Sequence, residues 1–393
     1  MWAYGIDKET VKKAVSVDLD KRKPSDYLVK LDVPKPEISS NEVLVKVNSS
    51  ALNYNSIWST LCHPISPFQL ISGYVGRNKH ESSHLQDFAI FGSDASGTIV
   101  KVGDNVKNWK IGDDVIIHCN IVDSEDPIIQ KDGMLSESQS IWGYETNYGA
   151  FAEYTKVKST QLIKKPDHLS WDEAASFGLT LSTAYRMLIS DNGAKIRPGE
   201  TCLIWGAAGG LGLFAIQLAK LAGANVIAIV SSDEKISVCK KFGADFVINR
   251  KKDFPKSFTD EDGNPDYLAW RKISLILKKL KAPDIDVVFE HVGKETLGLS
   301  IYLLKRGGRV VTCAATSGFL ATIDLRFLWM QLKSIVGSHF ANYDEANKAA
   351  KLVFENKITP VFSKNDIASL PEMMDKMYYG KTYGKIVFNH PLD

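Results

Sequence analysis

The chain has 393 residues, of which 44% are apolar, so it can bury a large core, and its length favours two domains over one. Its 48 Lys and Arg residues nearly balance its 46 Asp and Glu residues, which excludes a global attraction to nucleic acid or to an anionic membrane. An anionic ligand must therefore be bound by a local group of charges.

The N-terminal residues MWAYGIDKETVKKAV lack the apolar core of a signal peptide, and no window reaches the roughly 18 uninterrupted apolar residues of a membrane span. We expect a soluble, cytosolic protein. The cysteines form no CxxC pair and no close Cys/His cluster, so we expect reduced and mostly buried thiols. They are Cys62, Cys119, Cys202, Cys239 and Cys313.

The first part of the chain, from residue 27 to 120, is rich in short β-type runs separated by Gly, Pro and Asn. The clearest runs are 42–52, 97–103 and 112–119. This pattern predicts an open barrel or folded sheet.

The segment 141–154, IWGYETNYGAFAEY, places Tyr144 and Glu145 between two glycines, ahead of an apolar run that is typical of a strand. A phenol and a carboxylate at the start of a strand can take part in chemistry or can shape a turn. Both interpretations remain open from the local pattern alone.

From about Glu173 the pattern changes to an alternation of strands and helices. Near-continuous apolar strands that alternate with helices are typical of a parallel sheet covered on both faces, so we expect a doubly wound domain. We expect strands at 202–206, 225–230, 285–290 and 308–314, and helices at 211–222, 234–242 and near 295–304.

Residues 250–271 are polar and without a clear period, which predicts a long loop inserted into this alternation. After about residue 335 the chain returns to mixed short elements. One of them, 383–389, is expected to close back on the first domain.

The segment 203–224 runs from an apolar strand through a glycine-rich turn into an amphipathic helix. Such a turn lets backbone amides approach a pyrophosphate at the helix N-terminus, and so predicts dinucleotide binding. The alternative is an ordinary tight turn between strand and helix. The expected cofactor contacts are Gly206, Ala208, Gly209, Gly210 and Leu211, with Gly212 completing the glycine pattern.

The strand at 225–230 ends in 231-SSDEK-235, where an NAD site usually has an acidic residue for the ribose hydroxyls. Ser231, Ser232 and Lys235 can instead bind a 2′-phosphate, which favours NADPH. In the alternative interpretation Ser232 only caps the next helix, and Asp233 lies close enough to keep NAD open.

The order of a β-rich domain, a Rossmann domain and a short return resembles the medium-chain dehydrogenase/reductase superfamily. Its zinc enzymes use a Cys and a His-Glu pair, but here 53-NYNS-56 and 91-FGSDASG-97 stand at those positions. We therefore expect no metal. Without a metal to polarise an alcohol, reduction of an activated carbon–carbon double bond is favoured.

Several stretches together resemble the crotonyl-CoA carboxylase/reductase family, over nearly the whole chain. They are ALNYNSIW (51–58), IWGYETNYG (141–149), WGAAGGLG (205–212), VSSDEK (230–235), FEHVGKETLG (289–298), TCAATSG (312–318) and RFLWMQLKSIVGSHFANY (326–343).

The resemblance implies an α/β fold with a GroES-like, β-rich catalytic domain at 1–180, completed by 339–393, and a Rossmann NADPH-binding domain at 181–338. It also implies transfer of a hydride from NADPH to the β-carbon of a 2-enoyl-CoA thioester. The α-carbon then takes a proton or CO2, and the sequence leaves that choice open.

Carboxylating members of the family surround CO2 with an Asn, a Phe, a Glu and a His. The resemblance assigns the Glu to Glu145, the His to His339 and the Asn to Asn55 or to Asn53, which should face the same way if the segment is extended. The family's Phe is Tyr144 here. A phenol could donate a proton or hold a water, which weakens the case for efficient carboxylation.

The family contacts the adenine and phosphate end of coenzyme A with Tyr, Arg and Lys, which implies roles for Tyr302, Arg306 and Arg326. A surface Arg that is only solvated is the alternative for each of the two arginines. The loop at 250–271 matches a family insertion.

We therefore expect a cytosolic, metal-independent, NADPH-dependent reductase of crotonyl-CoA or acryloyl-CoA that assembles as a homo-oligomer, a dimer or tetramer, through the edges of the Rossmann domain. A quinone or enone oxidoreductase of the same superfamily is the alternative enzyme. A non-catalytic NADPH-binding protein, like the lens crystallins built on this fold, is the alternative from another class.

Overall fold

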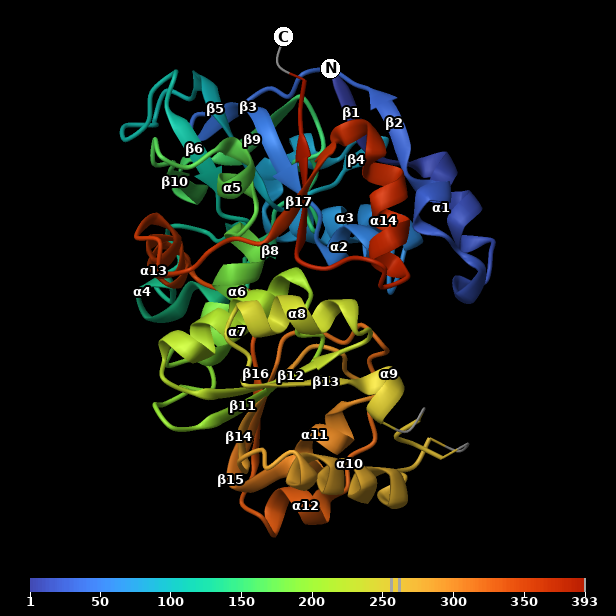
Figure 1. Cartoon of the computed structure of the whole chain (residues 1–393). Helices are drawn as coiled ribbons and strands as arrows, with labels where there is room; N and C mark the ends of the chain where they lie inside the picture. Colours follow the sequence, from blue (N-terminus) through green and yellow to red (C-terminus); the bar gives the residue numbers. More distant parts are fainter. Residues whose placement is uncertain (255–256, 261–262, 392–393) are drawn as a thin grey trace. The chain divides into compact units, whose positions relative to one another are not determined.

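The structure is a computed structural model that describes residues 1–254, 257–260 and 263–391. The chain forms two compact units, whose elements are labelled in Figure 1. The first unit contains Met1–Leu179, Asn342–Phe354 and Pro360–Asp393. The second contains Thr180–Ala341 and Glu355–Thr359.

The first unit is β-rich. Its strands are β1 (Trp2–Asp7), β2 (Val29–Asp32), β3 (Glu42–Ala51), β4 (Phe88–Ile90), β5 (Ala95–Val102), β6 (Asp114–Ile117), β7 (Asn120–Ile121), β8 (Ser140–Ile141), β9 (Tyr154–Lys158), β10 (Leu162–Lys164), β17 (Phe362–Asp366) and β18 (Lys385–Asn389). The main sheet has the order β10-β6-β5-β3-β18-β17, and β9 also pairs with β3. A smaller sheet has the order β2-β1-β4, and β7 pairs with β8.

The predicted β-runs of this unit are confirmed as β3, β5 and β6. The expected return of the C-terminal segment is also confirmed, because β18 pairs antiparallel with β3 and sets Val387 opposite Ala51. The strand expected directly after Gly149 is wrong, since β9 begins only at Tyr154. The amides of Gly149, Ala150 and Phe151 bond instead to the carbonyls of residues 90–92 in an irregular connection.

Helices cover the sheets of the first unit. They are α1 (Lys8–Val15), α2 (Tyr54–Leu61), α3 (Pro67–Arg77), α4 (Ile129–Asp132), α5 (Trp171–Ala175), α13 (Tyr343–Phe354) and α14 (Leu370–Tyr378), with a 3-10 helix η3 at Lys79–His84. The helix α6 (Gly178–Leu188) contains the division between the units.

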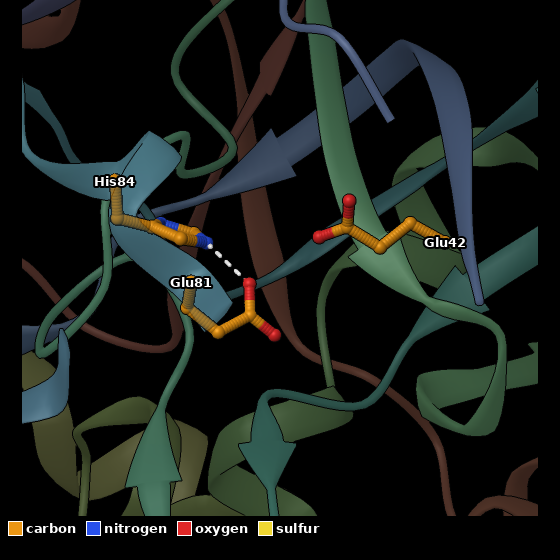
Figure 2. Close-up of side chains that lie close together, drawn as sticks. All are labelled: Glu42, Glu81 and His84. Atoms are coloured by element: carbon orange, nitrogen blue, oxygen red, sulfur yellow. Dashed lines mark ion pairs between the residues drawn. The ribbon is translucent and has the colours of Figure 1, made fainter. Parts of the chain in front are cut away.

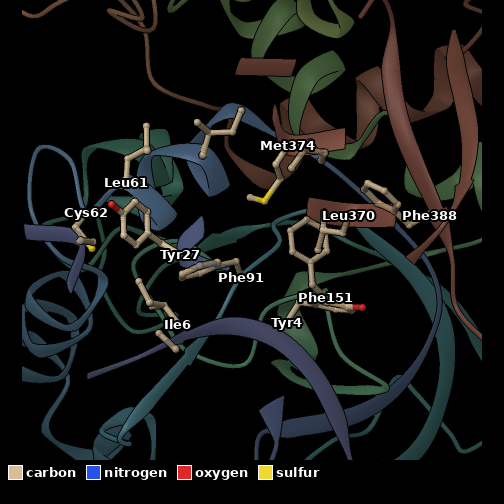
Figure 3. Close-up of a cluster of buried hydrophobic side chains, with 14 of the residues drawn as sticks. Tyr4, Ile6, Tyr27, Leu61, Cys62, Phe91, Phe151, Leu370, Met374 and Phe388 are labelled. Atoms are coloured by element: carbon tan, nitrogen blue, oxygen red, sulfur yellow. The ribbon is translucent and has the colours of Figure 1, made fainter. Parts of the chain in front are cut away.

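One apolar cluster of this unit gathers side chains from distant parts of the chain (Figure 3). Phe151 and Phe388 meet edge to face with their centroids 6.1 Å apart, and Phe91 is buried in the same cluster. Burial of each ring contributes about 1.5–3 kcal/mol. The core therefore fixes Phe151, which follows the segment of Tyr144 and Glu145, together with Phe91, whose carbonyl accepts from the Phe151 amide at 2.9 Å.

The second unit is a doubly wound α/β fold. Its strands are β11 (Thr201–Ile204), β12 (Asn225–Val230), β13 (Phe246–Asn249), β14 (Ile285–Glu290), β15 (Leu304–Thr312) and β16 (Ser334–Gly337). Its helices are α7 (Gly210–Leu221), α8 (Glu234–Lys241), α9 (Arg250–Asp253), α10 (Tyr267–Lys279), α11 (Leu297–Leu303) and α12 (Leu325–Trp329).

The described strands of this unit form one parallel sheet of order β13-β12-β11-β14-β15-β16. Helices α7 and α8 lie on one face, and α10 and α11 on the other (Figure 1). The strand order reverses between β11 and β14, so a ligand crevice is expected at the carboxyl ends of these two strands.

The long loop predicted at 250–271 is wrong in part, because α9 and the start of α10 lie within it. Asp266 caps α10 by accepting from the amides of Leu268 and Ala269. Ala269 and Trp270 are buried, so a short polar stretch precedes a helix with a buried face. Residues 255–256 and 261–262 of the predicted loop lie outside the described residues.

None of the helices in the described parts of the chain has the length and apolar character needed to cross a membrane.

Candidate active site

The glycine-rich turn between β11 and α7 needs glycine at two positions. Gly206 has a φ of +56°, and a Cβ there would lie 2.7 Å from the imidazole of His291. A Cβ on Gly212 would lie 2.6 Å from the backbone of Ala207. Both contacts are closer than a real side chain allows, so the turn is built for close approach of backbone.

The N-terminus of α7 follows this turn and carries no side-chain cap. Gly209 is the N-cap residue and is exposed, Gly210 and Leu211 are the first two helical residues, and Ala208 is buried beside them. The first amides of a helix lack intrahelical partners and favour an anion. The structure therefore brings the five predicted cofactor residues together in a cradle that fits a pyrophosphate.

The end of β12 carries the predicted cationic group. Lys235 donates from Nζ to Ser231 Oγ at 3.3 Å. Partial burial, and then the charge of Lys251, lower the pKa of Lys235. A nearby anion would relieve that repulsion between the two lysines, so the environment suits a phosphate group.

Asp233 is the acidic residue that could bind the ribose hydroxyls of NAD, but its carboxylate already has partners in the second unit. Asn249 Nδ2 donates to Asp233 Oδ1 at 2.9 Å, and Lys252 Nζ lies 3.4 Å from Oδ2. Asp233 is also the N-cap residue of α8 without a capping bond from its side chain, so the alternative role of Ser232 as the cap is not supported. The arrangement favours a 2′-phosphate over ribose hydroxyls.

Glu290 is a buried carboxylate at the carboxyl end of β14 that the sequence analysis missed. Its Oε1 accepts from the amides of Val292 and Gly293 and from Thr296 Oγ1, and its Oε2 accepts from Ser300 Oγ at 2.8 Å. These bonds fix the turn that places His291 against Gly206. The stretch FEHVG carries Glu290, but no spacing rule identifies such a positioning group.

In the first unit, Asn53 and Asn55 do not share a face. The segment is the start of helix α2, with Asn53 as its N-cap residue, so the extended geometry that would align the two side chains is wrong. Asn53 Nδ2 donates to Asp94 Oδ2 at 2.9 Å, and Asn53 Oδ1 accepts from Lys385 Nζ at 2.6 Å. Asn53 is thus committed to a buried network.

Asn55 is half-buried and is not part of the hydrogen bonds that join Asn53 to Asp94 and Lys385. Its Nδ2 donates to Ser93 Oγ at 2.9 Å. An amide nitrogen has two hydrogens, so one remains for a ligand. Of the two asparagines, Asn55 is therefore the better candidate to donate a hydrogen bond to a ligand.

The pair of Lys385 and Asp94 is buried beneath these asparagines, at 2% and 1% exposure with their charged atoms 2.8 Å apart. Asp94 Oδ1 also accepts from the amide of Leu179 at 2.7 Å. Loss of one partner leaves an uncompensated buried charge, which costs far more than loss of a surface pair.

We predict that Asp94→Asn lowers the free energy of unfolding by about 3–5 kcal/mol, because it strands Lys385 in the interior. The matched control is Lys376→Ala, which removes an exposed pair with Glu372 and should cost at most about 1 kcal/mol. Urea unfolding followed by circular dichroism measures both. Equal costs for the two variants would contradict the prediction.

The loop between β8 and β9 folds as a tight turn around Glu145. Its Oε2 accepts from the amide of Ile141 at 2.8 Å, and its own amide donates back to the Ile141 carbonyl at 2.8 Å. Glu145 therefore does shape the turn. Burial raises its pKa, against the opposing effects of the Ile141 amide and of Arg77.

Tyr144 is half-buried beside this carboxylate. Burial, and then the charge of Glu145, raise the pKa of Tyr144 to about 12, so its phenol is neutral at neutral pH and can donate a hydrogen bond. Cys119 is buried, and its carbonyl accepts from the amide of Trp142 at 2.8 Å. Burial, and then the charges of Asp94 and Glu145, raise the pKa of its thiol.

The alcohol dehydrogenase GroES-like domain family matches residues 39–167, and the zinc-binding dehydrogenase family matches residues 210–355. A crotonyl-CoA reductase of Streptomyces avermitilis is 46% identical over 85% of this chain and 75% of the relative. A crotonyl-CoA carboxylase/reductase of Cereibacter sphaeroides is 43% identical over 88% of this chain and 79% of the relative.

The chain belongs to the crotonyl-CoA carboxylase/reductase family. A solved 2-octenoyl-CoA carboxylase reductase, in complex with NADP and 2-octenoyl-CoA, matches with a TM-score of 0.93 at 38% identity, over 99% of this chain and 87% of that chain. The predicted resemblance and the predicted α/β fold with GroES-like and Rossmann parts are confirmed.

One matched family is named for zinc, but the residues at the corresponding positions of this crotonyl-CoA carboxylase/reductase family member do not fit that metal. Asn55 and Ser93 are hydrogen-bonded to each other, and Asp94 is paired with Lys385. These groups offer no thiolate or imidazole, and the lysine places a positive charge where a cation would have to lie.

The predicted CO2-binding residues of this family member are divided between the two units. Asn55, Tyr144 and Glu145 lie in the first unit, and His339 lies in the second, exposed after β16. The arrangement of Asn55, Tyr144 and Glu145 is therefore given within the first unit, and that of His339 within the second. That they act as one site stays a prediction.

The residues predicted to contact coenzyme A gather around α12 in the second unit. The ring of Tyr302 lies 4.9 Å from that of Phe327, and Arg306 donates to the carbonyl of Met330 at 3.1 Å. Arg326 is held by Asp324 at 2.7 Å, and this bond lowers the pKa of the carboxyl. Arg326 is therefore already paired, which weakens its assignment as a phosphate ligand.

Proposed function

We propose that this chain is an NADPH-dependent reductase of a short-chain 2-enoyl-CoA. The observation that carries the proposal is the match of 99% of the chain to the solved carboxylase reductase with NADP and an enoyl-CoA. The leading substrates are crotonyl-CoA and acryloyl-CoA. The thioester makes their double bond electrophilic, so the protein has to orient the substrate and control what reaches its α-carbon.

The cofactor site is proposed at the carboxyl ends of β11 and β12. The uncapped N-terminus of α7 would bind the pyrophosphate, and Ser231, Ser232 and Lys235 would bind the 2′-phosphate. Bound NADPH supplies the hydride that reaches the β-carbon.

The electrophile is proposed to be chosen by Asn55, Tyr144, Glu145 and His339. Asn55 keeps one amide hydrogen for a ligand, and the neutral phenol of Tyr144 can donate a proton or hold a water. A C–H bond forms at the α-carbon if a proton arrives, and a C–C bond forms if CO2 arrives. Tyr144 shifts the balance toward the proton.

Contacts to coenzyme A are proposed for Tyr302, Arg306 and Arg326. Arg306 is exposed and can turn toward a phosphate, whereas Arg326 would first have to leave Asp324. Assembly into a homo-oligomer is proposed through β16, one of the two edge strands of the described sheet in the second unit. Exposed apolar side chains at and before this strand support it, namely Leu325, Trp329, Leu332 and Ile335.

The proposed function is tested by following NADPH oxidation with crotonyl-CoA, and separately with a benzoquinone. We expect rapid oxidation with crotonyl-CoA only. Oxidation with the quinone only would identify a quinone oxidoreductase, and binding of NADPH without oxidation by either acceptor would identify a non-catalytic protein.

A further inference from the structure

Glu42, Glu81 and His84 lie together in the interior of the first unit (Figure 2). Glu42 begins β3, and Glu81 and His84 lie in η3. Each is at most 5% exposed. Burial of two carboxylates is costly unless their charges are met, so the cluster needs a reason.

A metal ion is one possible reason, since one ligand atom from each residue lies within 4.8 Å of the others. Two lysines, rather than a metal ion, neutralise these carboxylates. Lys156 Nζ lies 3.3 Å from Glu42, and Lys158 Nζ lies 3.4 Å from Glu81. Two ammonium groups would repel a divalent cation, so the cluster is a closed charge network.

His84 joins this network to the loop. Its Nδ1 accepts from the backbone amide of Asn147 at 3.2 Å, so Nδ1 carries no hydrogen and the ring hydrogen is on Nε2. Nε2 faces Glu81 Oε2 at 3.6 Å. Burial lowers the pKa of His84, which keeps the ring neutral and keeps Nδ1 an acceptor at neutral pH.

Asn147 uses both ends of its side chain to hold the loop. Nδ2 donates to the carbonyls of Phe88 at 2.7 Å and His84 at 3.3 Å. Oδ1 accepts from the amides of Ile90 at 2.9 Å and Tyr148 at 2.7 Å. With its backbone amide on His84, Asn147 ties the loop to η3 and β4.

The loop backbone is strained at the next residue. Tyr148 has a φ of +62°, a region that side-chain-bearing residues rarely adopt. Its ring packs against His84 at 5.6 Å, and Lys156 Nζ lies 5.5 Å from the ring centroid. Such a conformation persists only where its surroundings impose it, and here they are the same buried network.

We propose that His84, oriented by Glu81, is a positioning residue for the loop Ile141–Tyr148, and that it fixes Tyr144 and Glu145 for the step at the α-carbon. The proposal rests on the proposed function for its catalytic consequence. His84 does not touch the substrate. It supplies the acceptor without which the buried Asn147 amide loses its partner and the loop its fixed shape.

The test compares His84→Leu, which removes the acceptor, with His84→Asn, whose Oδ1 can take the place of Nδ1. The control is His80→Leu, which removes an exposed histidine on the other side of Glu81. We expect His84→Leu to speed amide exchange in the peptide covering 141–149 about tenfold, with no change in the peptide covering 203–222. His84→Asn should restore most of the protection, and His80→Leu should match the unmodified protein.

With crotonyl-CoA, His84→Leu should lower kcat about tenfold and change the ratio of carboxylated to protonated product, while the KM for NADPH stays the same. Unchanged exchange at 141–149, or an unchanged kcat and product ratio, would overturn the proposal. If His84→Leu speeds exchange throughout the first unit, the Glu81→Gln variant decides instead. We then expect faster amide exchange at 141–149 in Glu81→Gln, and exchange equal to that of the unmodified protein would overturn the proposal. If the unmodified protein does not reduce crotonyl-CoA, the proposed function fails, and the exchange experiment still decides whether His84 holds the loop.

Discussion

Replacement of Tyr144 by Phe is expected to raise the ratio of carboxylated to protonated product about tenfold in bicarbonate-rich buffer, a change of about 1.4 kcal/mol in the competition. The phenol of Tyr144 is neutral at neutral pH, because its pKa is raised to about 12. In the proposed site, this O–H would donate a proton or hold a water near the α-carbon. A phenylalanine removes this source of protons and leaves the ring in place.

The product ratio is read by mass spectrometry with labelled bicarbonate. Tyr154→Phe is the matched control, because it removes a phenol from β9, where Lys35 Nζ lies 3.4 Å from the ring centroid, and leaves the loop intact. An identical ratio in Tyr144→Phe and the unmodified protein would mean that the phenol does not control the electrophile. A ratio changed equally by Tyr154→Phe would contradict the assignment to Tyr144.

The second large effect is expected at the cofactor. Lys235→Ala should lower kcat/KM for NADPH about 10- to 100-fold and leave kcat/KM for NADH nearly unchanged, since only NADPH has the 2′-phosphate. Lys235 is bonded to Ser231, and Lys251 adds a second charge nearby. Steady-state kinetics with both cofactors measure the effect.

Lys252→Ala is the control for this variant, because Lys252 pairs with Asp233 on the other side of the same turn. The Lys252→Ala variant should change the ratio of kcat/KM for NADPH to kcat/KM for NADH only slightly. A kcat/KM for NADH comparable with that for NADPH in the unmodified protein would refute the role of the whole Ser231, Ser232 and Lys235 group.

The fold was predictable where local pattern decides it. Alternating and continuous apolar runs identified β3, β5 and four strands of the parallel sheet, β11, β12, β14 and β15, but not the edge strands β13 and β16. The glycine turn was recognised from its sequence, although the contact of Gly206 with His291 is tertiary. Helix α10 was missed, and its start lies within the predicted loop because Asp266 caps it immediately after a polar stretch.

The candidate site was predictable only in part. Asn53 was expected to face the substrate because the segment was taken as extended, but the helix α2 turns it toward Asp94. The partners of Asp94 and His84 could not be inferred, because Lys385 lies 291 residues from Asp94 and Asn147 lies 63 residues from His84. Such buried networks form only when the sheet brings distant segments together.

Glu145 shows why the sequence alone could not decide whether this segment shapes a turn or takes part in chemistry. The choice was between a turn and chemistry, and the carboxylate does close the turn on Ile141. Its raised pKa is a consequence of burial, which depends on tertiary packing. That Glu145 also faces the substrate stays a prediction.

The most direct test of the central claim is the fate of a labelled hydride. The protein is incubated with crotonyl-CoA and NADPH that carries deuterium at both positions of C4 of the nicotinamide, and the acyl product is analysed by mass spectrometry and NMR. We predict one deuterium at the β-carbon, with hydrogen or a carboxyl group from bicarbonate at the α-carbon. Absence of deuterium from the β-carbon, with crotonyl-CoA recovered unchanged, would contradict the account.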